Sequence, residues 1–171
     1  MPGSAISEYI MQSGQLNRAL KRLSMQIVED LKGNDDILVL GLNTRGYATA
    51  QAFTSLLEGS LKIKINCFPL DAHNSDPLSQ QVSNQISPNT YVLLVDDVLF
   101  SGSTMMNAIR KVLDSNNPKI LRVAVIIDRG HRRFPVQPDF VGLISPTKFK
   151  EHVEVEFDPD GVPSKVVLTE L

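Results

Sequence analysis

The sequence of 171 residues is poor in several features that would place it in a special class of protein. It has one cysteine, Cys67, so no disulfide can form within the chain, and we expect a reducing, cytoplasmic compartment. The apolar context of Cys67 predicts a small core residue, not a nucleophile. No apolar run is long enough to cross a bilayer, and the start shows no basic, apolar leader, so we expect neither a membrane span nor an export signal.

Charge is also nearly balanced, with 17 Lys and Arg against 19 Asp and Glu and a formal net charge of −2. This balance argues against a protein whose whole surface binds nucleic acid, although small basic groups occur at 18–22 and 129–133. The hydrophobic content of 42% suits one domain with a sizeable core. We therefore expect a single domain over residues 1–171.

The most informative stretch runs from residue 91 to residue 113. Five apolar residues, 91–95, predict a strand that is buried on both faces, as in a parallel sheet. Two carboxylates, Asp96 and Asp97, follow, and then a short loop of small residues and hydroxyls. Apolar residues at positions 105, 108, 109 and 112 then form the stripe of an amphipathic helix over 104–113. The order is strand, acidic corner, loop and helix.

This arrangement suits a sugar phosphate. Ligands of open α/β sheets collect at the carboxyl ends of the strands, and a loop that opens a helix presents N–H groups and a positive dipole end to an anion. Gly102 has no Cβ, so the backbone can approach a phosphate closely. The carboxylates of Asp96 and Asp97 could bind hydroxyl groups or a metal ion beside that phosphate. An ordinary turn with a helix N-cap is the alternative for these residues.

The rest of the chain alternates between strand and helix patterns, which predicts an α/β fold with a central, mostly parallel sheet flanked by helices. The expected strands are 6–11, 37–40, 61–68, 91–95, 120–127, 139–143, 154–157 and 166–168, and the expected helices are 13–32, 47–57 and 104–113. Ser13 is the expected N-cap of the first helix, and Gly33 is expected to end it. The polar stretch 69–89 is expected to be a functional or mobile loop.

A second anion site is indicated by the loop 41–46, which follows the strand 37–40. Thr44, Arg45 and Gly46 would place a hydroxyl, a guanidinium and N–H groups at the end of that strand. Such a tripeptide is weak evidence alone, but it gains weight from the loop 100–104. Arg129 also follows a buried strand, whereas His73 and the basic residues of 18–22 are expected to face solvent.

Residues 92–104 resemble the thirteen-residue phosphoribosyl pyrophosphate (PRPP) motif of the type I phosphoribosyltransferases. Segments 17–23, 44–46, 128–132 and 139–142 extend this resemblance over nearly the whole chain, and the resemblance implies the fold of that family. It also implies an enzyme that joins PRPP to a nucleobase, with uracil the favoured base and Mg²⁺ bound mainly through oxygens of the substrate.

The resemblance further implies a role for each matched residue. Asp96 and Asp97 would hold the ribose hydroxyls, and Asp97 would help to stabilise positive charge on the ring. The 5′-phosphate would be bound by Phe100, Ser101, Gly102, Ser103 and Thr104. The pyrophosphate would be bound by Thr44, Arg45 and Gly46. The base would be bound by Arg129, Phe149 and Val153. For Phe149, an ordinary core position is the alternative. The 69–89 arm would fold over the site.

Two other functions stay open at this point. One is a nucleotide-sensing, RNA-binding regulator of pyrimidine genes, and the other is a phosphoribosyltransferase for another base, such as a purine. The sequence departs from the most similar family members at Asn43, Ser103 and Asp71, where Lys, Arg and Arg are usual, and each departure affects anion binding. The family also implies a homodimer or a larger homo-oligomer.

Overall fold

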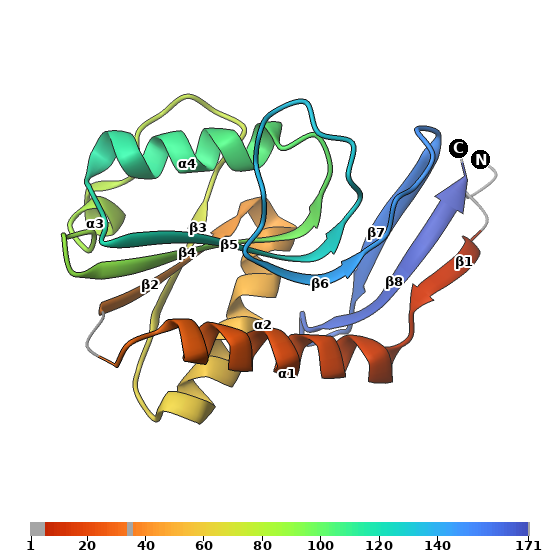
Figure 1. Ribbon diagram of the computed structural model, residues 1–171, viewed down its shortest axis with the longest axis horizontal. Helices are drawn as coiled ribbons and strands as arrows, with labels where there is room; N and C mark the ends of the chain where they lie inside the picture. Colours follow the sequence, from red (N-terminus) through yellow and green to blue (C-terminus); the bar gives the residue numbers. More distant parts are fainter. Residues whose placement is uncertain (1–5, 34–35, 171) are drawn as a thin grey trace.

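The computed structural model describes residues 6–33 and 36–170 (Figure 1). The strands are β1 (Ile6–Met11), β2 (Asp36–Leu42), β3 (Asn66–Leu70), β4 (Thr90–Leu99), β5 (Ile120–Asp128), β6 (Phe140–Ile144), β7 (Glu151–Phe157) and β8 (Pro163–Glu170). The helices are α1 (Ser13–Asp30), α2 (Asn43–Leu61), α3 (Gln80–Ser83) and α4 (Ser103–Ser115).

Five strands form the central sheet in the order β3-β2-β4-β5-β6, and every neighbouring pair is parallel. Helices α1 and α2 lie on one face of this sheet, and α3 and α4 lie on the other (Figure 1). Strand β4 is central, and five consecutive residues, 91–95, are fully buried in it, as a strand covered on both faces requires. The α/β fold predicted from the sequence is confirmed.

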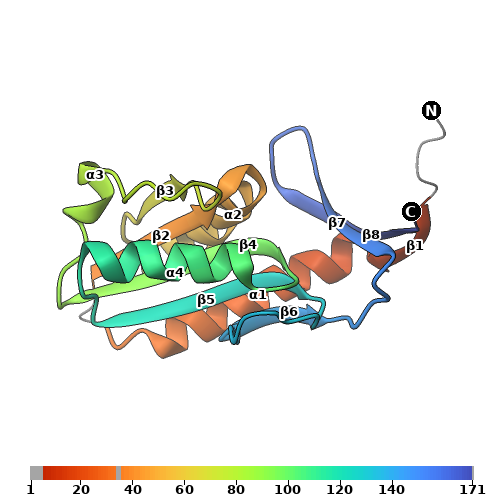
Figure 2. The same cartoon turned by 90° about the horizontal axis from the view of Figure 1, so that it is seen from above.

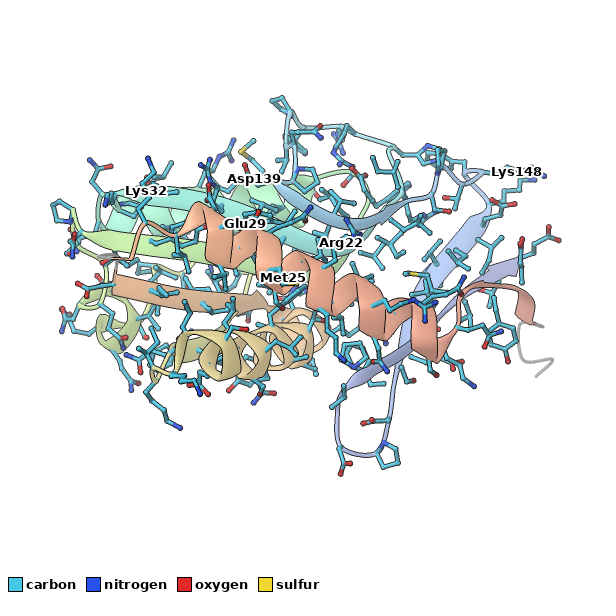
Figure 3. All side chains as sticks on the ribbon, turned by 60° about the horizontal axis from the view of Figure 1, so that its bottom comes forward. Arg22, Met25, Glu29, Lys32, Asp139 and Lys148 are labelled. Carbon is cyan, nitrogen blue, oxygen red and sulfur yellow. The ribbon has the colours of Figure 1, made fainter. Side chains whose placement is uncertain are left out.

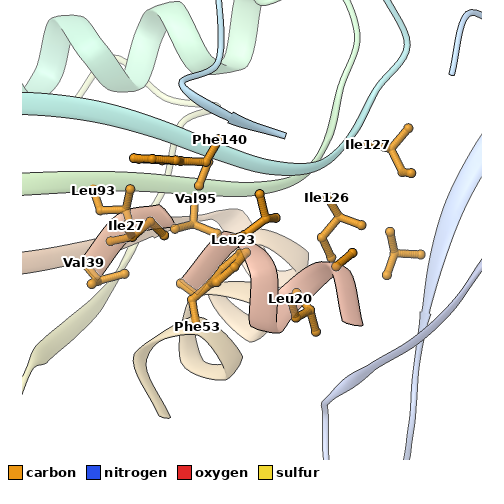
Figure 4. Packing of buried hydrophobic residues seen from close by; sticks show 14 of the residues in the cluster. Leu20, Leu23, Ile27, Val39, Phe53, Leu93, Val95, Ile126, Ile127 and Phe140 are labelled. Carbon is orange, nitrogen blue, oxygen red and sulfur yellow. The ribbon is translucent and has the colours of Figure 1, made fainter. Parts of the chain in front are cut away.

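The larger core lies between the sheet and helices α1 and α2 (Figure 4). The predicted stripe of α1 faces it, because Leu16, Leu20, Leu23 and Ile27 are all at most 3% exposed. Phe53 of α2 joins them against the sheet. A second core fills the other face, where side chains of α4 and of the segment around α3 cover β2, β4 and β5. The 69–89 stretch therefore contributes a short helix to the second core.

A separate antiparallel sheet stands beside the carboxyl end of the central sheet (Figure 2). Its order is β1-β8-β7, so it joins the first strand of the chain to the last two. Val153, Val155 and Val166 attach this sheet to the larger core. We call it the hood. The sequence predicted each of its strands but not their assembly into a second sheet.

Several element boundaries differ from those predicted. Helix α1 has Gln12 at its N-cap, not Ser13, and the backbone N–H of Gln12 donates to Oε1 of Gln15 at 2.8 Å. The strand predicted over 61–68 is wrong in its first half, because α2 continues to Leu61 and ends at Lys62, which has a left-handed backbone with φ 56°. Strand β3 therefore begins only at residue 66.

The outer face of α1 carries polar side chains together with the exposed Met25 (Figure 3). Arg22 was predicted to be simply solvated, but its Nη2 donates to the carbonyl oxygens of Val141 and Gly142 at 3.3 and 2.7 Å. These oxygens belong to β6, the edge strand of the central sheet, so Arg22 ties α1 to that edge. Within the described ranges, no helix is both long and apolar enough to span a membrane.

Candidate functional site

The acidic pair lies inside β4, not beyond its end as predicted. Ladder pairing with β5 continues to Leu99, so Asp96 and Asp97 belong to the second half of the strand. Asp97 is 8% exposed, and its backbone N–H donates to Oδ1 of Asp96 at 2.9 Å. Burial, together with the neighbouring charge of Asp97, raises the pKa of Asp96 well above its ordinary value. Holding two carboxylates side by side in a buried position lowers the stability of the folded protein. Such an unfavourable arrangement is typical of a functional site.

Replacing Asp96 with asparagine is therefore expected to stabilise the protein at about pH 7. Each kcal/mol gained in the free energy of unfolding should raise the melting temperature by roughly 2–4 °C. A raised pKa means that ionised Asp96 opposes folding. This cost grows as the pH rises from the ordinary value of 3.8 through the folded-state pKa, and it vanishes below 3.8. Thermal unfolding at about pH 7 and about pH 3 measures it. A lower melting temperature of Asp96→Asn at pH 7 would contradict the assignment, and Asp114→Asn, at an exposed site, is the control.

Arg45 approaches the acidic pair from the first turn of α2. The predicted loop 41–46 is wrong, because β2 extends to Leu42 and α2 begins at Asn43 and includes Thr44, Arg45 and Gly46. The Nε of Arg45 lies 3.0 Å from Oδ2 of Asp97, and its Nη1 lies 3.2 Å from Oε1 of Glu154 in the hood. Arg45 also donates to the carbonyl oxygen of Val155. One guanidinium thus links the central sheet to the hood.

Gly46 allows α2 to begin directly against the acidic pair. A Cβ at this position would lie 2.9 Å from the carbonyl oxygen of Val95 and 3.0 Å from Oδ1 of Asp96. Such contacts are too short for any residue with a side chain, so glycine is required for this close approach. The start of α2 and the carboxylates of β4 are consequently immediate neighbours, as the sequence predicted for two loops at one edge of the sheet.

The loop 100–104 connects β4 to α4 in the predicted manner. Gly102 has φ 83°, a left-handed conformation that favours glycine, and α4 starts at the next residue. Oγ of Ser101 accepts a hydrogen bond from the backbone N–H of Ser103 at 3.3 Å. The N–H groups of the first turn and the positive dipole end of α4 therefore meet at this loop, where an anion would bind. Thr104 lies in that first turn and is partly exposed.

Arg129 directly follows β5, as predicted, but its side chain is only 6% exposed. Its Nε donates to Oγ1 of Thr147 at 2.9 Å, its Nη2 donates to the carbonyl oxygen of Glu151 at 2.6 Å, and its guanidinium carbon lies 4.3 Å from the centre of the Phe100 ring. Burial lowers the pKa of Arg129. The side chain thus holds the segment that leads into the hood.

The neighbouring basic residues have similar internal partners. The ring of His131 bonds through Nε2 to the carbonyl oxygen of Thr147. Arg132 bonds to Oδ2 of Asp128 at 2.7 Å and to the carbonyl oxygen of Phe100 at 2.9 Å. Arg129, His131 and Arg132 of the basic group 129–133 therefore attach loops to the end of β5.

A cavity of about 490 Å³ lies between the carboxyl end of β4 and the hood. It is lined by Arg45, Asp97, Val98, Phe100, Arg129, Phe149, Glu151, His152, Val153 and Glu154. Phe149 is 80% exposed, so the alternative that it is a core residue is wrong. Its ring centre lies 6.1 Å from that of Phe100 and 5.9 Å from that of His131. Val153, in contrast, has its side chain in the core and is 4% exposed.

Some residues at this site escaped the sequence analysis. Glu154 was noted only as part of an alternating strand, yet it binds Arg45 and lines the cavity. Asn107 and Lys111 of α4 bind the start of the 69–89 stretch, and no local pattern indicated such contacts. His73 is exposed, as predicted. Cys67 packs beside the core, and burial raises the pKa of its thiol, which fits the expected unreactive residue.

Sequence comparisons find related proteins over most of the chain. A family model described as a phosphoribosyl transferase domain matches residues 8–160. The chain is 35% identical over 173 residues to the "Bifunctional protein PyrR" of Brevibacillus brevis, which covers 95% of this chain and 96% of that protein. It is 36% identical over 162 residues to the protein of the same name from Limosilactobacillus reuteri, with 86% of this chain and 90% of that protein covered.

Solved structures share the fold at low sequence identity. The hypoxanthine phosphoribosyltransferase of Trypanosoma cruzi superposes with a TM-score of 0.76 at 16% identity, covering 96% of this chain and 97% of that chain. The HGPRT-ase of Leishmania tarentolae, solved in complex with GMP, gives a TM-score of 0.74 at 16% identity, covering 95% and 97%. At such identities the likeness concerns the fold alone.

Proposed function

The chain belongs to the phosphoribosyltransferase family, and we propose that it transfers a phosphoribosyl group from PRPP to uracil, which gives UMP and pyrophosphate. The observation that carries this proposal is the meeting of three groups at one edge of the sheet: the carboxylate of Asp97, the guanidinium of Arg45 and the helix-opening loop 100–104. The adjoining cavity of about 490 Å³ has the size of a small-molecule site.

Each part of PRPP has a counterpart among these groups. Asp96 and Asp97 hold the ribose hydroxyls, and the loop from Phe100 to Thr104 holds the 5′-phosphate through N–H groups and hydroxyls. Thr44, Arg45 and Gly46, at the start of α2, hold the pyrophosphate. Arg45 pairs with Asp97 and Glu154, so binding of pyrophosphate to its guanidinium would compete with these two ion pairs.

The base enters the cavity between β4 and the hood. Phe149 offers an exposed ring for stacking, and Val153 offers backbone groups because its side chain is buried. Arg129, which was expected to touch the base, is assigned instead to holding the segment of Thr147 and Glu151 in place beside it. Base recognition by the backbone explains why the side chains alone do not reveal which base is bound.

The reaction breaks the bond between C1 of the ribose and the pyrophosphate oxygen while a base nitrogen attacks C1. Positive charge develops on the ribose ring, so the protein has to position both reactants and stabilise charge, and needs no nucleophile of its own. The carboxylate of Asp97 supplies the negative charge on the ribose side. Arg45 supplies positive charge to the leaving group.

Mg²⁺ fits this site as a companion of the substrate. The described residues hold no group of three or more His, Cys, Asp and Glu side chains that could bind a metal ion. Mg²⁺ keeps several waters and commonly binds through substrate phosphates, so pyrophosphate and ribose oxygens would hold most of it here, and Asp96 and Asp97 could each contribute a carboxylate oxygen. When bound, the ion neutralises charge on the leaving pyrophosphate.

A screen with PRPP, Mg²⁺ and each nucleobase tests the proposed function. We expect chromatography to show PRPP-dependent UMP with uracil and little product with hypoxanthine, guanine or adenine. Nucleotide from a purine alone would assign a different base specificity. The absence of product with every base would contradict an enzymatic function.

An RNA-binding regulator of pyrimidine genes is the second candidate, because the relatives bear the name of a bifunctional protein. Arg18 and Lys21 are exposed on α1, whereas Arg129 and Arg132 are engaged inside the protein. This arrangement reduces the basic surface available for phosphate contacts. A gel-shift titration with the cell's own pyrimidine leader RNA, with and without UMP, compares the two functions. Tight RNA binding that responds to UMP, without phosphoribosyl transfer to any base, would make the regulator the preferred function.

The same proposal includes the organisation of the protein. It acts as one domain in a homodimer or larger homo-oligomer, and the start of the 69–89 arm lies beside the first turn of α2. Movement of this arm is assigned to residues 75–79, which lie between two packed parts and are mostly exposed. The cytoplasmic location expected from the sequence stays a prediction.

A further inference from the structure

The first part of the 69–89 arm is hydrogen bonded from two sides. We propose that Asn107 and Lys111 of α4 are positioning residues, which fix the backbone of residues 71–74 and thereby hold the pyrophosphate and 5′-phosphate subsites at a set separation. This inference rests on the function proposed above. It concerns residues far along α4 that do not line the cavity.

Lys111 is buried, with an exposed fraction of only 8%, which is unusual for a lysine. Its Nζ lies 2.6 Å from the carbonyl oxygen of Asp71 and 2.6 Å from Oδ1 of Asn74. A buried ammonium is costly unless polar groups surround it, so these two oxygens are what allow Lys111 to stay there. The carboxylate of Asp71 also accepts a hydrogen bond from Nδ2 of Asn74, at 2.9 Å. The turn 71–74 is thus ordered around the Lys111 amine.

Asn107 lies one helical turn before Lys111 and binds the same segment. Its Nδ2 donates to the carbonyl oxygen of Ala72 at 2.6 Å and to that of Asn74 at 3.1 Å. The backbone N–H of Ala72 donates in the other direction, to Oδ1 of Asn43 at 2.9 Å. Ala72 is therefore held at both of its backbone polar groups, once by α4 and once by the start of α2.

These contacts connect the two proposed anion subsites. Asn43 directly precedes Thr44 and has a left-handed backbone with φ 56°. Asn107 lies four residues after Ser103, roughly 6 Å along α4 from the 5′-phosphate loop. The path from Asn43 through Ala72 to Asn107 thus joins the first turn of α2, which forms the proposed pyrophosphate subsite, to α4, which follows the 5′-phosphate loop. A change in this path alters the separation of the two subsites.

The distance between the two subsites affects only a ligand that occupies both of them. PRPP carries a 5′-phosphate and a pyrophosphate and has to match both subsites at once, whereas UMP carries the 5′-phosphate alone. Loss of the contacts should therefore weaken PRPP while sparing UMP. A contact that merely stabilises the fold would produce no such difference between the two ligands.

The test uses Lys111→Met, which keeps an apolar stem of similar length but removes the amine, together with Asn107→Ala. The control is Arg110→Met, at the neighbouring exposed position of α4. We expect each test variant to raise the KM for PRPP about tenfold, as the loss of about 1.4 kcal/mol implies, and to change the Kd of UMP less than twofold. Lys111→Arg, which keeps a donor, should recover part of the loss, and Arg110→Met should change neither constant.

Hydrogen exchange of residues 71–74 provides a readout that needs no turnover. The amides of Ala72 and His73 are hydrogen bonded in the folded protein, and both should exchange faster in Lys111→Met and Asn107→Ala. Equal weakening of PRPP and UMP, or unchanged exchange in both variants, would overturn the inference. An inactive wild-type protein would instead contradict the proposed function. Should Lys111→Met fail to fold, Asn107→Ala decides alone, because position 107 is only partly buried.

Discussion

Asp97→Asn is expected to lower kcat/KM for phosphoribosyl transfer by roughly 10- to 150-fold while the protein stays folded, because a charge-assisted hydrogen bond contributes about 1.5–3 kcal/mol. The carboxylate of Asp97 faces the cavity, where it would accept a hydrogen bond from the ribose. Asparagine has nearly the same volume, so packing should be preserved. The negative charge of Asp97 is one cause of the raised pKa of Asp96, so removing this charge should lower that pKa towards its ordinary value. Steady-state kinetics and thermal unfolding measure the two effects.

Asp114→Asn serves as the matched control, because Asp114 is an exposed aspartate on α4. It should leave both kinetics and melting temperature unchanged. Two outcomes would remove the ribose-binding role from Asp97. One is unfolding of Asp97→Asn, which would make the residue structural, and the other is transfer at the wild-type rate.

Arg45→Ala is expected to weaken PRPP and pyrophosphate by roughly 10- to 150-fold and UMP by less than about threefold. Only the first two ligands occupy the subsite at the start of α2. The loss of Arg45 also frees Asp97 from its ion pair, so binding of the ribose should not suffer. Calorimetry with all three ligands measures the difference.

Arg45→Lys is the informative companion variant. Lysine keeps the charge but lacks the planar fork that contacts Asp97, Glu154 and Val155 together, so an intermediate affinity for pyrophosphate is expected. Equal weakening of PRPP, pyrophosphate and UMP by Arg45→Ala would place the side chain outside the pyrophosphate subsite.

Much of the fold was predictable because its signals are local. The buried strand 91–95, the stripe of α1 and the stripe of α4 follow from apolar spacing, and all three were found where expected. The order of strands and helices then implied a parallel sheet. The hood was not predicted as a sheet, because β1 ends at Met11 and β7 begins only at Glu151, and only long-range pairing brings the three strands together.

The errors at the site have a similar cause. Two charged residues suggested the end of a strand, but pairing with β5 carries β4 past Asp96 and Asp97. Asn43, with its positive φ, allows α2 to start at once after β2, so the expected loop around Arg45 becomes a helical turn. The partners of Arg129 lie 18 and 22 residues further along the chain, and no spacing rule reveals them. Such contacts depend on tertiary structure.

The most direct test of the account is a comparison of UMP with its 2′,3′-dideoxy analogue on the wild-type protein and on Asp97→Asn. If the acidic pair holds the ribose hydroxyls, removing the hydroxyls should cost the wild-type protein about 1.5–3 kcal/mol of binding free energy and the variant much less. Calorimetry supplies the four affinities. A coupling of at least about 1 kcal/mol between the two changes is the predicted result. Strictly additive losses would show that Asp97 does not bind the ribose, and would contradict the site described above.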